Sequence, residues 1–286
     1  MPSDPQTLDK LASSLSKLTD RLKTTTDTPR LDAQVLLAHV LGRGRAWVLS
    51  HPEVGLNEFQ RQALDRAAKR LESGEPLPYV LGEWEFFGLL FRLTPQVLIP
   101  RPETELLVEL AHLWLDEQPE RRLAADIGTG SGCIAIALAT TLHDLRVIAT
   151  DISSEALQVA GDNVLRHKVT DRVRLVQSDL LDNLEGPFDL ICANLPYIPT
   201  ATLHTLKVYQ REPTLALDGG ARGLDLISRL LKQAPSRLAP RGLLLMEIEA
   251  SQGAEVSALA RHAFPEGDVR IVADLAGHDR VVRLLS

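Results

Sequence analysis

The tetrapeptide Asn194-Leu195-Pro196-Tyr197 contains the residue types best suited to chemistry in this chain. It follows the apolar segment 188–193, which predicts a buried strand ending where the tetrapeptide begins. The side-chain oxygen of Asn194 and the backbone carbonyl of Leu195 can accept both N–H bonds of a flat NH2 group. Tyr197 can stack on the same group and align it. We therefore expect residues 194–197 to orient a planar nitrogen that acts as a nucleophile.

A glycine-rich turn lies earlier in the chain, in Asp126-Ile127-Gly128-Thr129-Gly130-Ser131-Gly132. Glycines at alternate positions let the backbone turn tightly and approach a ligand without an intervening side chain. Asp151 follows Gly130 by 21 residues and ends the next predicted strand. A carboxylate at that place can accept hydrogen bonds from both hydroxyls of a ribose. The alternative interpretation is structural, with Asp151 capping a helix that begins at Ser153 or Ser154.

Both segments belong to a pattern of alternating strands and helices that begins after Pro102. Apolar runs predict strands near 122–127, 145–150, 173–177, 188–193, 242–248, 269–273 and 280–284. Helical patterns cover 103–115, 132–142, 153–167, 222–238 and 251–263. This alternation predicts an open, mainly parallel sheet with helices on both faces. Residues 274–279 are too few for a parallel crossover, so the last strand should run antiparallel.

Residues 1–75 show a different pattern, in which leucines recur at three- and four-residue steps between polar connectors. We expect a small helical domain there, followed by a linker over 76–100. The linker should contain a β-hairpin, because aromatic and branched residues flank the turn glycine Gly88. The α/β domain is expected to cover 101–286.

The composition excludes several classes of protein. The formal net charge of −7 argues against a protein that binds mainly by neutralising phosphates. Cys133, Cys192 and the eight histidines show neither a disulfide framework nor the spacing of metal ligands, so we expect no metal. Residues 1–5 lack a basic region followed by an apolar core, and no apolar run approaches about 18 residues. We therefore expect a cytoplasmic protein that neither spans nor binds a membrane.

The glycine turn resembles that of the class I S-adenosylmethionine-dependent methyltransferases. Its spacing is G-x-G-x-G after Asp126, rather than the G-x-G-x-x-G of a pyrophosphate loop, and the predicted sheet ends antiparallel. The resemblance implies S-adenosylmethionine as the cofactor, with Asp126 near its methionine part, Asp151 on its ribose and Asp179-Leu180 beside its adenine. The cofactor-binding residues that it implies are Asp126, Ile127, Gly128, Thr129, Gly130, Asp151, Asp179, Leu180 and Asn194.

The tetrapeptide resembles the (Asn/Asp)-Pro-Pro-(Tyr/Phe) motif of methyltransferases that act on adenine N6, cytosine N4 or glutamine N5. Leu195 stands where that motif has its first proline. Leucine at this position still supplies the backbone carbonyl, and Pro196 still favours an extended backbone at Leu195. The rigidity of the loop is altered. The resemblance implies that the catalytic residues are Asn194, Leu195, Pro196 and Tyr197.

Further motifs over nearly the whole chain are similar to those of the HemK-type release factor glutamine methyltransferases. They are EPLPYVLG at 75–82, EFFG at 85–88, LIPRPETE at 98–105 and ALDGG at 216–220. The resemblance implies that the substrate is the glutamine of the Gly-Gly-Gln loop of bacterial class 1 release factors. It also implies that the helical domain helps to grip the factor. Residues 101–105 can equally be a helix start, so we leave them out of the catalytic set.

The sequence departs from the same family at Glu249, where glycine is common.

Three other functions stay open. A DNA adenine methyltransferase would need a basic surface and a target-recognition region, and this acidic chain has no obvious insertion for either. A ribosomal protein glutamine methyltransferase would share the same catalytic domain. A non-enzymatic protein that only binds S-adenosylmethionine is the third. We expect a monomer without direct nucleic-acid contacts.

Overall fold

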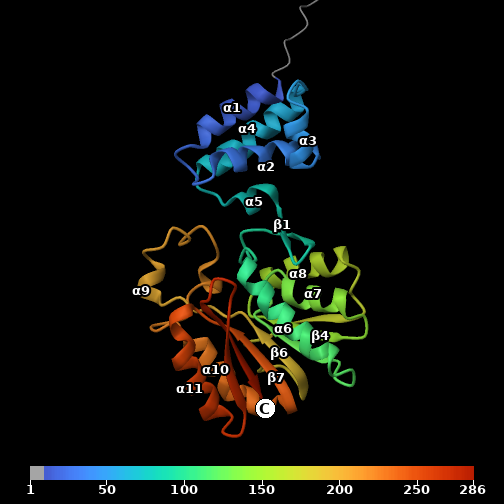
Figure 1. Ribbon diagram of the computed structural model, residues 1–286, viewed down its shortest axis with the longest axis vertical. Coiled ribbons are helices and arrows are strands. Elements are labelled where there is room, and N and C mark those ends of the chain that lie inside the picture. The colour runs from blue at the N-terminus through green and yellow to red at the C-terminus, as the bar shows by residue number, and fades with distance from the viewer. Residues whose placement is uncertain (1–9) are drawn as a thin grey trace, which may run out of the picture. The chain divides into compact units, whose positions relative to one another are not determined.

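The computed structural model describes residues 10–286, which form two compact units, one ending at Gly82 and one covering Glu83–Ser286 (Figure 1). Residues 1–5, on which part of the expected localisation rests, lie outside the described residues. Among the helices of residues 10–286, none combines the length and the hydrophobicity that crossing a membrane requires.

The smaller unit is helical. Its helices are α1 (Leu11–Leu22), α2 (Pro29–Leu41), α3 (Arg45–Ser50), α4 (Glu58–Glu72) and α5 (Leu77–Leu81). The predicted leucine face of α1 is buried at Leu11, Leu18 and Leu22, where it packs with α2 and α4 in one apolar cluster. The unit includes α5, so it extends past residue 75 to Gly82, whose left-handed backbone ends that helix.

The larger unit begins with the predicted hairpin, formed by β1 (Glu83–Phe86) and β2 (Leu89–Arg92). Phe87 and Gly88 make its turn, both with positive φ, as a two-residue hairpin loop requires. The amide of Phe87 donates to the Oε1 atom of Glu105 at 2.8 Å, which fixes this unfavourable conformation. The hairpin is thereby attached to the start of the helix that follows it.

The main sheet has seven strands in the order β5-β4-β3-β6-β7-β9-β8. Only β9 runs against the other strands, because it pairs antiparallel with both β7 and β8. The predicted mainly parallel sheet with an antiparallel last strand is therefore confirmed. The strands are β3 (Leu123–Ile127), β4 (Arg146–Asp151), β5 (Val173–Gln177), β6 (Phe188–Ala193), β7 (Leu238–Glu247), β8 (Asp268–Ala273) and β9 (Asp279–Leu285).

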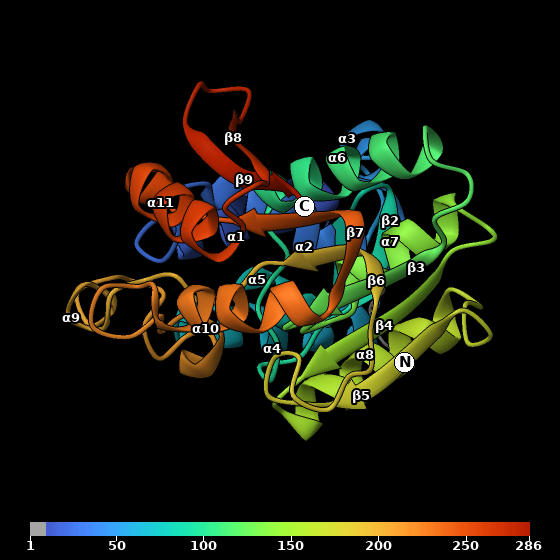
Figure 2. The same cartoon turned by 90° about the horizontal axis from the view of Figure 1, so that it is seen from below.

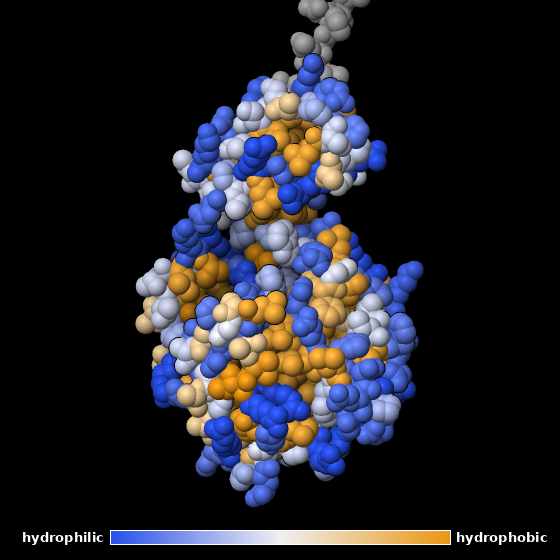
Figure 3. Space-filling model, viewed as in Figure 1, coloured by the Kyte–Doolittle hydropathy of each residue, from blue (hydrophilic) through white to orange (hydrophobic). Residues whose placement is uncertain are grey.

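Helices cover both faces of this sheet (Figure 2). On one face lie α6 (Glu105–Asp116), α7 (Cys133–Thr141) and α8 (Ser154–Arg166), and on the other lie α10 (Asp225–Gln233) and α11 (Gly253–Ala263). Alternate residues of β3, β6 and β7 pack on α10 and α11 in the main apolar cluster. The outer surface of this unit mixes apolar and polar residues, with apolar ones gathered over the middle of the face in Figure 3.

The boundaries predicted for one helix and for the start of the strand after it are wrong. The helix expected over 222–238 covers only Asp225–Gln233, with a 3-10 turn at Ala234–Ser236, and β7 begins at Leu238 instead of 242. Pro235 lies inside that turn, and proline lacks the N–H that a continuing α-helix needs. The strand therefore starts as soon as the turn ends.

Candidate active site

The glycine turn and the tetrapeptide lie against each other at one edge of the sheet. Strands β3 and β6 are neighbours, and Ile127 at the end of β3 pairs with Ala193 at the end of β6. A Cβ atom on Gly128 would lie only 3.1 Å from the Cδ2 atom of Leu195. The structure thus brings together the two segments in which the sequence predicts chemistry, because parallel neighbouring strands end at the same edge.

The turn needs its glycines for their backbone conformation. Gly128, Gly130 and Gly132 have φ values of 72°, 55° and 83°, in the left-handed region that other residues rarely adopt. A Cβ on Gly130 would meet no heavy atom of residues 10–286 within 4 Å. The backbone at Gly130 is therefore approachable from outside.

Asp126 is a buried carboxylate with one free oxygen. Its Oδ2 atom accepts hydrogen bonds from Thr129 Oγ1 at 2.6 Å and from the amide of Ala135 at 3.2 Å. Its Oδ1 atom is buried and has no hydrogen-bond partner within residues 10–286. Burial raises the pKa of Asp126 to about 6, against hydrogen bonds that lower it. An oxygen of this kind suits a cationic or N–H donor of a ligand.

Asp151 holds the turn and a helix at the same time. Its Oδ2 atom accepts from the amide of Gly130 at 2.9 Å, and its Oδ1 atom accepts from the amide of Ser153 at 3.0 Å. Ser153 in turn caps α8 through its own hydroxyl. Burial raises the pKa of Asp151. The helix-cap interpretation therefore describes one of its two hydrogen bonds, while the other joins Asp151 to the glycine turn.

Ile127 and Leu180, two of the predicted cofactor-binding residues, have buried side chains. The side chain of Leu180 is buried in the main apolar cluster, and its φ is 53°. Ile127 is fully buried in the same cluster. The carboxylate of Asp179 forms a surface ion pair with Arg229 at 2.7 Å. At Ile127 and Leu180 a ligand would therefore meet the backbone rather than the side chain.

Two side chains of the tetrapeptide form hydrogen bonds with residues outside the glycine turn. The Nδ2 atom of Asn194 donates to the Oγ1 atom of Thr104 at 2.9 Å, which turns its Oδ1 atom away from Thr104. The hydroxyl of Tyr197 donates to the Oε1 atom of Glu247 at 3.4 Å. Leu195 is buried in the main apolar cluster.

All four residues of the tetrapeptide line one pocket of about 110 Å³. Its other lining residues are Leu98, Arg101, Ile198, Val208, Ala216 and Leu217. The buried carboxylate of Glu212 forms an ion pair with Arg101 and accepts from the amide of Ile99 at 3.0 Å, which fixes this wall. The pocket is apolar apart from the tetrapeptide and Arg101, so it suits a short side chain with a polar tip.

The backbone of the loop is braced by glycines and by Gln252. The Nε2 atom of Gln252 donates to the carbonyl oxygen of Tyr197 at 3.0 Å. A Cβ on Gly223 would lie 2.1 Å from that same oxygen, and one on Gly219 would lie 2.7 Å from the carbonyl oxygen of Pro196. Positions 219 and 223 therefore accept only glycine without displacing the loop.

Two residues of this site were missed from the sequence, Thr104 and Glu247. Glu247 ends β7 and is 1% exposed. Burial raises its pKa to about 7, although the Thr104 hydrogen bond and the charge of Arg280 lower it. A lone carboxylate at the end of a strand of apolar residues is a signal that could have identified it, because such a group is costly to bury.

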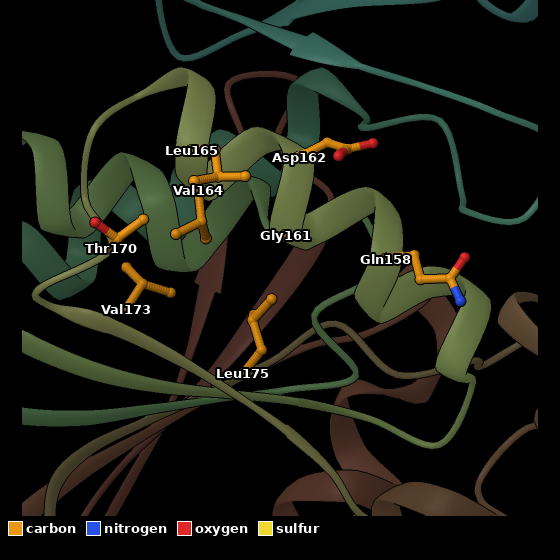
Figure 4. Close-up of a pocket in the computed structure, with 8 residues that line it drawn as sticks. All are labelled: Gln158, Gly161, Asp162, Val164, Leu165, Thr170, Val173 and Leu175. Atoms are coloured by element: carbon orange, nitrogen blue, oxygen red, sulfur yellow. The ribbon is translucent and has the colours of Figure 1, made fainter.

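A larger hollow, of about 610 Å³, lies elsewhere on the same unit, between α8 and β5 (Figure 4). Its lining is mostly apolar, and no residue of the glycine turn or of the tetrapeptide takes part in it. It lies beside the edge strand of the sheet, and it lacks the convergent polar groups of the smaller pocket.

Comparison with known proteins assigns both units. The PrmC N-terminal domain model matches residues 14–82, and the methyltransferase small domain model matches residues 103–211. The release factor glutamine methyltransferase of Moorella thermoacetica is 44% identical over 256 residues, covering 89% of this chain and 90% of that protein. The one of Bradyrhizobium diazoefficiens is 39% identical over 288 residues, covering 98% and 96%. The chain belongs to the release factor glutamine methyltransferase family.

Solved structures agree on the fold. The hMettl16 catalytic domain, solved with an RNA hairpin, has a TM-score of 0.56 at 17% identity, covering 79% of this chain and 81% of that one. A methyltransferase from Pyrococcus furiosus has a TM-score of 0.52 at 22% identity, covering 70% and 89%. The methyltransferase fold expected from the glycine turn is therefore confirmed.

Glu249, where the sequence departs from the family, lies at the start of a turn that contacts the tetrapeptide loop. Glu249 caps the 3-10 turn Ala250–Gln252, where its Oε2 atom accepts from the amide of Ser251 at 2.9 Å. Its own amide donates to the Oε1 atom of Gln252 at 3.1 Å. This backbone hydrogen bond fixes the side-chain amide of Gln252 with its Nε2 atom toward the carbonyl oxygen of Tyr197, so the turn supports the 194–197 loop.

Glu247 predicts an unusual dependence of stability on pH. Because its folded pKa of about 7 lies above the unfolded value near 4.5, the folded state binds more protons between these values. Stability from this group is therefore present below pH 4.5 and is lost as the pH rises through 7. Glutamine at position 247 does not titrate. The free energy of unfolding of Glu247→Gln minus that of the wild type should therefore increase by about 2–3 kcal/mol from pH 4.5 to pH 8. Urea denaturation at both pH values tests this, and a pH-independent difference would contradict it.

Proposed function

We propose that the chain transfers a methyl group from S-adenosylmethionine to the side-chain amide nitrogen of the glutamine in the Gly-Gly-Gln motif of class 1 peptide chain release factors. The observation that carries the proposal is the pocket lined by Asn194 and Tyr197, which suits a short side chain with a flat polar tip and whose lining residue Leu195 also packs against Gly128 of the glycine turn. Relatives of 37–44% identity over most of the chain bear the corresponding name.

The residues of the glycine turn fit S-adenosylmethionine. The free Oδ1 atom of Asp126 suits the ammonium group of the methionine part, directly or through a water molecule. Asp151 lies at the tip of the neighbouring strand and suits the ribose hydroxyls. Asp179 and the backbone of Leu180 complete the site on the adenine side. When bound, the cofactor supplies an electrophilic methyl carbon attached to a sulfonium.

The tetrapeptide can orient and activate the weakly nucleophilic amide nitrogen. An amide nitrogen is a poor nucleophile, because its lone pair is delocalised into the carbonyl. The Oδ1 atom of Asn194 and the carbonyl of Leu195 can accept both of its N–H bonds, so they orient the group and stabilise positive charge that develops on nitrogen. Tyr197 stacks on the flat carboxamide and keeps it in line, so positioning supplies most of the rate acceleration.

The partner follows from the same substrate. A glutamine inside a folded factor must be presented on an exposed loop, and a chain that carries a helical unit in addition to its catalytic unit suits such a partner. Release factors act in translation, so we propose that the protein works in the cytoplasm. We also propose that it acts as a monomer. The helical unit would bind the body of the factor.

The direct test incubates the purified chain with methyl-labelled S-adenosylmethionine and a release factor, and then maps the label by mass spectrometry. We expect label on the Gly-Gly-Gln glutamine and none on a factor in which asparagine replaces that glutamine, because the shorter side chain cannot reach the pocket. Label only on a ribosomal protein or on DNA would reject the proposal. Binding of the cofactor in calorimetry without turnover on any glutamine substrate would identify a non-enzymatic binding protein instead.

A further inference from the structure

Of the described residues that line the pocket of the tetrapeptide, Arg101 alone carries a positive charge. Its backbone is extended, with φ −101° and ψ 144°, which is the conformation favoured for a residue before a proline, here Pro102. The Nη2 group of Arg101 donates to the Oε1 atom of Glu212. The Oε2 atom of Glu212 accepts from the amide of Ile99 at 3.0 Å. This buried carboxylate therefore holds Arg101 on the wall of the pocket.

The guanidinium of Arg101 has hydrogen-bond donors that remain available to a ligand. An arginine side chain carries five N–H donors and no acceptor. Within residues 10–286 those of Arg101 bind Glu212 alone, through Nη2, so Nε and Nη1 make no hydrogen bond there. The side chain is 35% exposed and can be reached by a ligand. By contrast, Asn194 and Tyr197 direct side-chain donors at residues outside the pocket.

A substrate carboxamide needs donors as well as acceptors, because its two ends are unlike. Its two N–H bonds have acceptors in the side-chain oxygen of Asn194 and the carbonyl of Leu195. Its oxygen needs a donor, because a carbonyl that enters an apolar pocket without one loses its hydrogen bonds to water. The two acceptors of the loop cannot fill this need.

We propose that Arg101 is a substrate-binding residue that donates through Nε or Nη1 to the side-chain oxygen of the substrate glutamine. This inference rests on the proposed function. Acceptors at one end of the pocket and a cationic donor at the other satisfy only one of the two orientations of the carboxamide, the one with nitrogen at Asn194. Glu212 is then a positioning residue for Arg101. Residue 101 thereby gains a role beyond the start of a helix.

The inference predicts an effect on KM rather than on kcat. Arg101→Met keeps the apolar stem but removes every donor, so KM for the release factor should rise about 10- to 100-fold, the usual effect of losing a hydrogen bond to a charged group. The carbonyl oxygen gains no negative charge when the nitrogen attacks, so this bond is no stronger in the transition state. We therefore expect kcat to stay within about threefold of the wild type.

A double-mutant cycle identifies the atom that Arg101 binds. The partner variant is a release factor in which methionine replaces the glutamine of the motif, because methionine has a similar length but no carbonyl oxygen. Dissociation constants are measured by calorimetry with S-adenosylhomocysteine present, so that no transfer occurs. Arg101→Met should weaken binding of the glutamine factor about 10- to 100-fold and that of the methionine factor less than about threefold.

Two further variants control for charge and for folding. Arg166 is 38% exposed and pairs with Glu83 at 3.0 Å, but it does not line the pocket, so Arg166→Met should leave both dissociation constants within about twofold. Arg101→Met leaves the buried carboxylate of Glu212 without its cation, which can destabilise the fold. Adding Glu212→Gln removes that charge and keeps an acceptor for the amide of Ile99. The double variant should show the same loss of binding as Arg101→Met.

The outcomes separate this inference from the proposed function. If the wild type does not methylate a Gly-Gly-Gln factor, the proposed function itself fails. If the wild type is active, an unchanged KM in Arg101→Met and in the double variant overturns the role of Arg101. A fall in kcat without a rise in KM also overturns it. So does equal weakening of the two factors in the cycle, because Arg101 would then contact a part of the factor other than the glutamine oxygen.

Discussion

Asn194→Ala should lower kcat for glutamine methylation by about 10² to 10³-fold, the usual cost of removing one group that stabilises charge in a transition state. Alanine leaves the substrate amide with the carbonyl of Leu195 alone, so its nitrogen is neither oriented nor charge-stabilised. The fold should tolerate the change, since Asn194 is partly exposed and, within residues 10–286, its side chain makes one hydrogen bond, to Thr104. We expect a loss of about 1 kcal/mol in the free energy of unfolding.

Single-turnover kinetics with the release factor, together with urea denaturation, measure both effects. Asn194→Asp is the informative companion, because it keeps an acceptor toward the substrate but loses the N–H that Thr104 accepts. Its kcat should lie between those of the wild type and the alanine variant. A kcat of Asn194→Ala within tenfold of the wild type would remove Asn194 from the mechanism.

The second large effect is expected at Gly223. Its φ of 72° is left-handed, and an added Cβ would lie 2.1 Å from the carbonyl oxygen of Tyr197 and 2.8 Å from the Nε2 atom of Gln252. Gly223→Ala must therefore displace the 194–197 loop. Backbone strain and overlap together should cost about 3 kcal/mol of stability, and turnover should fall by about 10²-fold or more.

Gly277→Ala is the control that separates these two causes. Gly277 has a similar φ of 83°, but within residues 10–286 a Cβ there would meet no atom closer than 4 Å. This variant carries the strain without the overlap, so it should lose about 1 kcal/mol and keep full turnover. If Gly223→Ala loses no more stability and activity than Gly277→Ala, the bracing role of position 223 is wrong.

The sequence was sufficient for those features that depend on local patterns. The short connection 274–279 predicted the antiparallel last strand, and β9 confirms it. The sequence also predicted strands ending at 127 and 193, directly before the glycine turn and the tetrapeptide, and these two ends pair at one edge of the sheet. Each of these predictions needs only the periodicity of one or two segments.

The sequence was insufficient where a role depends on packing between distant segments. Thr104 lies 90 residues before Asn194, and Glu247 lies 50 residues after Tyr197, so no local pattern relates them. The motif 101–105 already had a local explanation as a helix start, which hid its contact with Asn194. The inward side chain of Leu180 was equally invisible, because its positive φ follows from the turn as a whole.

The contact between Leu195 and Gly128 has a consequence for how the two ligands meet. Leu195 lines the pocket of the tetrapeptide, and its Cδ2 atom lies 3.1 Å from the position that a Cβ on Gly128 would take. One buried side chain therefore contributes to the shape of the pocket and also packs against the glycine turn. Trimming or enlarging residue 195 would consequently alter transfer and cofactor retention together, as one coupled property of the enzyme rather than two.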